Sequence, residues 1–286
     1  NVGRATDLIN GVRAIQKKTA AVGSGLPAFE TEWNKASLEL TSLDEKARQR
    51  NWSGAPVAMR ALAEVAQGRV TPLLEGSRGF ATSTKPADGL LYMGEATGQA
   101  EFSSFLYGLN VPCKGEALAL RSYLPELQRL QQKVNAAFVP PKSIEMHPRF
   151  IALNSTLKLG QELDSSRSYA GALYAYLEAT RHFGMLDTPV PDADKLKKLR
   201  AAVAEKLKAL ASSQQDESMQ QLFLQRAQNY LAHDDASKSQ DDELKAAAVI
   251  VEQVLPAYAA ALKPAAPVMR APAKTVDITL VRWPYT

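Results

Sequence analysis

Apolar residues recur every three or four positions along most of the chain, a period typical of α-helices that bury one face. This period predicts helices over residues 6–21, 27–50, 55–67, 88–109, 116–138, 148–163, 168–183, 192–210, 216–232 and 241–262. The helix at 116–138 could be broken near Ser122 and Pro125. Proline, glycine and short polar runs separate them, which is how helices end. We therefore expect an all-α protein of about ten helices in antiparallel hairpins, either a helical bundle or a repeat array.

Two stretches depart from the helical period. Residues 68–85 contain Pro72, Gly76 and Gly79, which favour a loop, and the piece at 80–84 could be extended. Residues 264–274 are rich in proline and alanine, as in semi-rigid linkers. The chain thus divides into helical regions 1–142 and 143–263, which could form one continuous domain, and a tail at 264–286.

The end of the tail alternates between apolar and polar residues, and a period of two predicts a β-strand. A lone strand leaves its backbone groups unpaired, so it must find a partner. We expect it to pair with an extended piece such as residues 80–84, with a second copy in a homodimer, or with a different protein. The residues that would make this contact are Val276, Ile278, Leu280 and Trp283.

A short polar break at residues 164–166 separates two predicted helices that carry small residues at regular intervals. The positions that define the pattern are Leu159, Gly160, Leu163, Tyr169, Ala172, Tyr176 and Ala179. The stretch 153–186 resembles one tetratricopeptide-repeat unit, although Gly184 stands where that family has proline. Any tight helical hairpin selects small residues at its crossing, so ordinary close packing is the alternative interpretation. No second unit is visible, and the whole chain matches no known pattern.

The resemblance implies a docking surface for a peptide or a partner helix rather than a reaction. In a repeat of this kind the first helix lines a concave groove. By position, the groove residues would be Asn154, Leu157, Lys158 and Gln161.

Composition changes this picture little. The 286 residues are 45% hydrophobic and 22% charged, which is ordinary for a soluble globular protein. The net charge of +4 is spread along the chain, which argues against nucleic-acid binding. No apolar run is long enough to predict a transmembrane helix. The chain begins at Asn1, so we expect a removed leader and a secreted or periplasmic protein, with a cytoplasmic location left open.

Candidate chemistry is sparse. The nearest approach to a metal-binding spacing is Glu178 and His182, four residues apart, and we expect neither a metal nor a cofactor. Cys113 is the only cysteine, which excludes an internal disulfide, and we expect it to be structural. No phosphate-binding loop or serine elbow is present, so we predict no catalytic residues.

These observations leave three classes of function in order of preference. The first is a non-enzymatic, exported helical scaffold that binds a protein or peptide. The second is a small-ligand-binding protein with an aromatic pocket between helices. Its lining would be Tyr92, Phe102, Phe105, Tyr107, Tyr174 and Phe183. An enzyme assembled from scattered acidic residues comes last.

Overall fold

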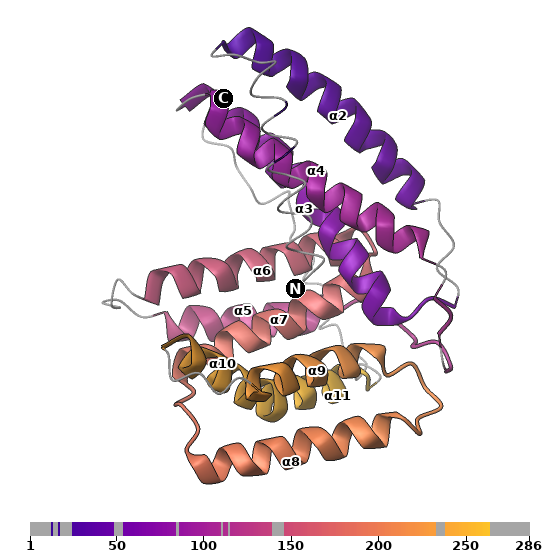
Figure 1. The fold of residues 1–286 in the computed structure, drawn as a ribbon, viewed down its shortest axis with the longest axis vertical. Coiled ribbons are helices and arrows are strands. Elements are labelled where there is room, and N and C mark those ends of the chain that lie inside the picture. Colours follow the sequence, from indigo (N-terminus) through magenta and orange to yellow (C-terminus); the bar gives the residue numbers. More distant parts are fainter. Residues whose placement is uncertain are drawn as a thin grey trace, which may run out of the picture.

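A computed structural model describes residues 25–48, 54–83, 86–109, 111–113, 115–138, 146–232 and 238–263, together with residues 13 and 17. Over these ranges the protein is all-α, which confirms the predicted fold class (Figure 1). The linker and Val276, Ile278, Leu280 and Trp283 lie outside the described residues, as does most of the predicted helix 6–21. The helices are α2 (Leu26–Arg48), α3 (Val57–Ser83), α4 (Pro86–Gly108), α5 (Leu124–Ala137), α6 (His147–Ser165), α7 (Tyr169–Asp187), α8 (Ala193–Leu210), α9 (Ser218–Ala232), α10 (Lys238–Val249), the π-helix η2 (Ile250–Val254) and α11 (Leu255–Ala261).

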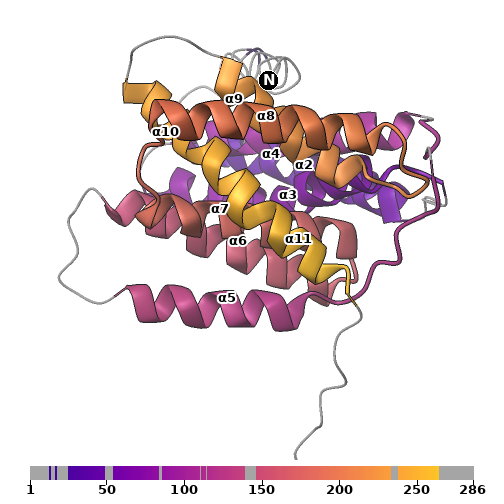
Figure 2. The same ribbon diagram turned by 90° about the horizontal axis from the view of Figure 1, so that it is seen from below.

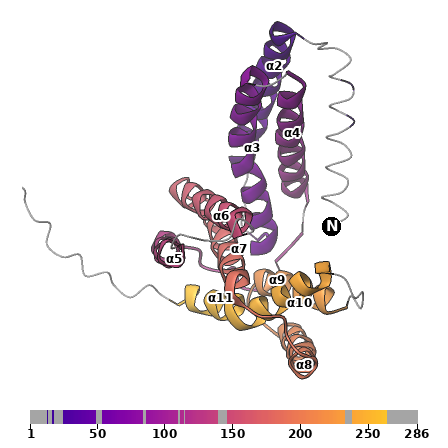
Figure 3. The same cartoon turned by 90° about the vertical axis from the view of Figure 1, so that its left-hand side faces the viewer.

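The helices form three groups in chain order (Figures 1 and 3). Helices α2, α3 and α4 make the first, and the pairing of α3 with α4 is its most extensive contact. Helices α5, α6 and α7 make the second, in which α5 lies along one edge beside α6 (Figure 2). The third holds α8, α9 and the continuous helix α10–η2–α11. Helices α3 and α7 each contact helices of all three groups, so they connect the groups to one another.

Helix α3 corrects the prediction of a loop over 68–85, because one helix continues to Ser83 through Pro72. Beyond the proline the helix buries Leu74, Ser77 and Ala81, one side chain per turn, against α4. Burial of this face outweighs the cost of the proline, which is about 3 kcal/mol in a helix interior. The extended piece expected at 80–84 is therefore helical through Ser83, so it offers no extended strand there.

The segment between α4 and α5 corrects the first part of the predicted helix 116–138, which could be broken near Ser122 and Pro125. Residues 117–123 are not helical, and α5 begins only at Leu124, with proline in its first turn. Glu116 instead forms an isolated parallel β-bridge with Gln215, the only β-pairing within the described ranges. Leu118 and Leu120 pack against the largest core cluster. This extended segment thus connects the second and third helical groups.

The last helix contains a π-helical turn at Ile250–Val254. Pro256 has no N–H, so it cannot donate to the carbonyl four residues earlier. The N–H of Leu255 reaches five residues back to the carbonyl of Ile250, which absorbs the defect without ending the helix. The stretch Gln240–Ala261 is long and apolar enough to cross a membrane. However, 56% of its most apolar window is buried inside the fold, as in the core helix of a soluble protein.

Candidate functional site

The predicted hairpin is present as α6 and α7, joined by a tight turn in which Arg167 adopts a positive φ of 62°. A Cβ added to Gly160 would lie 2.8 Å from Leu127 Cδ2 and 3.2 Å from Ala175 Cβ. Gly160 therefore lies where α5, α6 and α7 approach one another closely. Ala172 and Ala179 are fully buried. Small residues at these contacts are compatible with both interpretations of the hairpin.

The four predicted groove residues do not share one accessible surface. Leu157 is fully buried in the cluster between α5, α6 and α7, so the prediction is wrong at this position. Asn154 is exposed, and its side-chain oxygen accepts a hydrogen bond from Gln131 of α5 at 3.1 Å. Lys158 is exposed and Gln161 is half-buried. Helix α5 therefore occupies part of the face that the resemblance assigned to a partner.

The exposed face of α6 nevertheless carries one large apolar side chain. Ile151 is 66% exposed and lies about one helical turn before Asn154 and two before Lys158. Lys158 makes only a long contact of 3.7 Å with Glu162. We call the residues Ile151, Asn154 and Lys158 the α6 face.

The six aromatic residues predicted to line a ligand pocket are spread over separate parts of the fold. Tyr92 stacks on Phe80, with ring centroids 4.2 Å apart, and Phe105 is 61% exposed. The other four belong to three different hydrophobic clusters: Phe102 and Tyr107 to one, Tyr174 to a second and Phe183 to a third. The structure does not bring these side chains together, so the predicted common lining is wrong.

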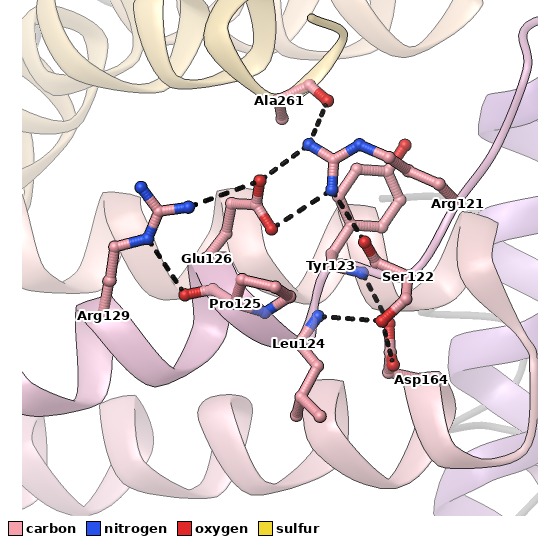
Figure 4. A network of polar contacts seen from close by, with 9 residues as sticks. All are labelled: Arg121, Ser122, Tyr123, Leu124, Pro125, Glu126, Arg129, Asp164 and Ala261. Carbon is pink, nitrogen blue, oxygen red and sulfur yellow. Dashed lines mark hydrogen bonds and ion pairs between the residues drawn. The ribbon is translucent and has the colours of Figure 1, made fainter. Parts of the chain in front are cut away.

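Buried carboxylates form the most regular polar feature of the fold. Asp164 of α6 is only 8% exposed, and it accepts two hydrogen bonds from the start of α5 (Figure 4). The backbone N–H of Tyr123 donates to Oδ1 at 2.6 Å, and the hydroxyl of Ser122 donates to Oδ2 at 2.7 Å. Tyr123 is the N-cap of α5, so Asp164 satisfies a backbone group at the positive end of that helix.

Two other buried carboxylates repeat this arrangement. Asp216 Oδ2 accepts from the N–H of Val57, the first residue of α3, at 2.7 Å, while Oδ1 accepts from Ser218 at the start of α9. Glu64 of α3 accepts from the N–H of Gly171, in the first turn of α7, at 2.7 Å. Burial raises the pKa of Glu64, and its contact with Arg60 opposes the rise only in part. Each carboxylate thus connects one helix to the N-terminus of another.

Arg121 makes a matching contact with a helix C-terminus (Figure 4). Its guanidinium donates to Glu126 Oε1 at 2.7 Å and to the carbonyl of Ala261, at the end of α11, at 2.9 Å. It also lies over the ring of Tyr123, 5.0 Å from the centroid. A cation at this position is favoured by the negative end of the helix dipole. The start of α5 is therefore fixed to both α6 and α11.

Glu178 forms a different kind of buried cluster, between α7 and α9. Arg181 donates to Oε2 at 2.9 Å, and Arg226 of α9 donates to Oε1 through a short hydrogen bond. Arg226 Nε also donates to the hydroxyl of Tyr230 at 2.8 Å. Burial alone would raise the pKa of Glu178, but the charges of Arg181 and Arg226 outweigh it and lower the pKa. Burial and the charge of Arg181 lower the pKa of the adjacent His182 to about 4, so this histidine is neutral at pH 7.

The remaining candidates for chemistry have structural surroundings. Burial raises the pKa of the Cys113 thiol, which disfavours the reactive thiolate. No group of three or more His, Cys, Asp or Glu side chains is placed to hold a metal ion among the described residues. His233 lies outside those residues, and His147 faces the ring of Phe138.

Comparison with known proteins adds no assignment: no family model, no curated protein and no solved structure matches this chain. The candidate sites therefore rest on their geometry alone.

Sequence reasoning had a local signal for only one of the buried carboxylates, since Asp216 is the first residue of the predicted helix 216–232. It had none for the partners of Asp164 or Glu178. Those partners come from other helices, and the distance along the chain from Glu178 to Arg226 is 48 residues.

Proposed function

We propose that the protein is a non-enzymatic helical scaffold that binds a protein or peptide partner. The main support is the use of its buried carboxylates as connections between helices. Both oxygens of Asp164 and both oxygens of Asp216 accept hydrogen bonds from within the fold. A general acid or base must reach a substrate or a water molecule, and carboxylates saturated in this way are poorly placed to do so. Their evident effect is to fix the angles between helices.

The α6 face is the best candidate for partner binding on this scaffold. It belongs to a helix that Asp164 attaches to α5 and that packs along α7. A large exposed side chain, Ile151, lies there among polar residues, and such an arrangement is common where proteins meet. A rigid helix that presents an apolar residue loses little conformational entropy when a partner binds.

A pull-down with matched variants tests this proposal. The purified chain is immobilised and exposed to an extract of the source organism, in parallel with an Ile151→Ser, Lys158→Ala double variant. A Lys197→Ala variant of the exposed face of α8 serves as the control, because it removes the same charge elsewhere. We expect one protein to bind saturably to the wild type and to the control but not to the double variant. Equal recovery on all three chains, or no saturable binding at all, would contradict the proposal.

A further inference from the structure

The cluster between α7 and α9 contains more positive charge than its own carboxylate can balance. Glu178 supplies one negative charge, and both Arg181 and Arg226 contact it. His182 is neutral at pH 7, so it neither adds to this positive charge nor offsets it. The side chains are 11%, 12% and 33% exposed for Glu178, Arg181 and Arg226, so water screens the excess charge only in part. The three side chains together carry one net positive charge, and an external anion would balance it.

The two guanidinium groups also retain unused donors. Arg181 uses Nε and Nη2, and Arg226 uses Nε and Nη1, in their contacts with described residues. Within those residues Nη1 of Arg181 and Nη2 of Arg226 have no acceptor. The hydroxyl of Tyr230 accepts from Arg226 and keeps its own hydrogen for a further acceptor. Guanidinium and phenol donors together suit the oxygens of a carboxylate or a phosphate.

A third arginine, on α3, acts electrostatically on a tyrosine beside this cluster. The charges of Arg69, Arg181 and Arg226 all act on the hydroxyl of Tyr174, where burial and Glu178 outweigh them and raise the pKa to about 12. Arg69 is exposed. Arginine charges from α3, α7 and α9 therefore all act on Tyr174.

We propose that Arg181, Arg226 and Tyr230 form a binding site for an oxyanionic group, a carboxylate or a phosphate, supplied from outside the chain. One arginine would be enough to connect α7 and α9 through Glu178. Binding of an external oxyanion gives the second arginine a role. If the oxyanion is an acidic side chain of a partner, the site deepens the proposed scaffold function. If it is a free anion, the site is independent of that function.

Binding of inorganic phosphate and of a labelled peptide rich in glutamate tests the proposal directly. Isothermal titration follows phosphate and fluorescence anisotropy follows the peptide, each with the wild type, Arg226→Gln and the charge-matched control Lys197→Gln. We expect the wild type and the control to bind at least one probe, and Arg226→Gln to bind it about tenfold or more weakly, as loss of a charge-assisted hydrogen bond implies. Dependence on Arg226 for phosphate identifies a free anion as ligand, and dependence for the peptide alone identifies an acidic partner.

A second variant keeps the test decisive if Arg226→Gln does not fold. Arg226→Lys preserves the charge beside Glu178 but removes the planar fork of donors, so it should still weaken binding. Equal affinity of the wild type and the folded variants for both probes, or no measurable binding of either probe, would overturn the site. Neither titration uses the α6 face or a natural partner, so failure here is distinguishable from failure of the proposed scaffold function.

Discussion

The connection between Asp164 and α5 makes the most quantitative prediction, through the substitution Asp164→Ala. The change removes two short hydrogen bonds, to the N–H of Tyr123 at 2.6 Å and to the hydroxyl of Ser122 at 2.7 Å. A hydrogen bond to a charged group contributes about 1.5–3 kcal/mol, and the buried N–H of Tyr123 would be left without a partner. We therefore expect the free energy of unfolding to fall by about 3–5 kcal/mol.

Two further substitutions distinguish the effect of losing the hydrogen bonds from the effect of losing an acidic side chain. Asp164→Asn keeps an oxygen for the N–H of Tyr123 but loses the charge, and bonds to a neutral acceptor are about half as strong. We expect it to cost about 1–2 kcal/mol. Glu162→Ala removes an exposed carboxylate two residues away, whose only ion pair with a described residue is a 3.7 Å contact with Lys158. Its cost should be within about 0.5 kcal/mol.

Urea denaturation followed by circular dichroism measures all three values. An unchanged slope of the free energy of unfolding against urea concentration would show that the unfolded states of the variants are comparable. Hydrogen exchange of the Tyr123 amide gives an independent check, because that amide should become unprotected in Asp164→Ala alone. If Asp164→Ala costs no more than Glu162→Ala, or if the Tyr123 amide stays protected, Asp164 does not connect α5 to α6 as argued here.

Three other measurements probe the packing, the protonation and the tail. Gly160→Ala should lower the free energy of unfolding by about 1–3 kcal/mol, because its Cβ would lie 2.8 Å from Leu127. Gly76→Ala should raise it by about 0.5–1 kcal/mol, because nothing lies within 4 Å of the added Cβ. Urea denaturation measures both changes, and the same sign for both would contradict this prediction. The pKa of His182 is about 4 in the folded protein and 6.5 in the unfolded chain, so the unfolded chain binds a proton more readily. The free energy of unfolding should therefore fall as the pH is lowered from about 6.5 to 4. Allowing for solvent screening, the fall is about 1–2 kcal/mol, and His182→Gln should abolish it. A chain that ends at residue 263 should lose stability or change its oligomeric state, measured by urea denaturation and light scattering, if the tail pairs as a strand; unchanged values would refute the pairing.

Local signals were sufficient to predict α6, α7 and the helices of the last group. Pro148 occupies the first turn of α6, and the observed helix begins one residue earlier than predicted. Asp192 is the first residue of the predicted helix 192–210, and its side chain caps α8 by accepting from the N–H of Lys195 at 2.8 Å. In such cases the boundary depends on residues within one turn of it, so a single sequence contains the information.

The errors occur where distant contacts decide the outcome. The second half of α3 contains Pro72, yet it is helical because Leu74 and Ala81 are buried against α4. Residues 117–123 looked helical, yet Glu116 pairs with Gln215, almost a hundred residues later in the chain. Neither partner can be inferred from the local pattern, because the pattern states only that a face is apolar and not what will cover it.

The position of each carboxylate along the helices explains why excess positive charge lies between α7 and α9 and not at the other buried carboxylates. Asp164 and Asp216 face the first turns of neighbouring helices, where backbone N–H groups have no partner within the helix. Those groups stabilise a carboxylate without any cation, and neither side chain makes an ion pair with a described residue. Glu178 lies in the middle of α7 and faces the middle of α9, where every N–H is already bonded within its own helix. Its only available donors are arginine side chains, and two of them bring one positive charge more than Glu178 can neutralise.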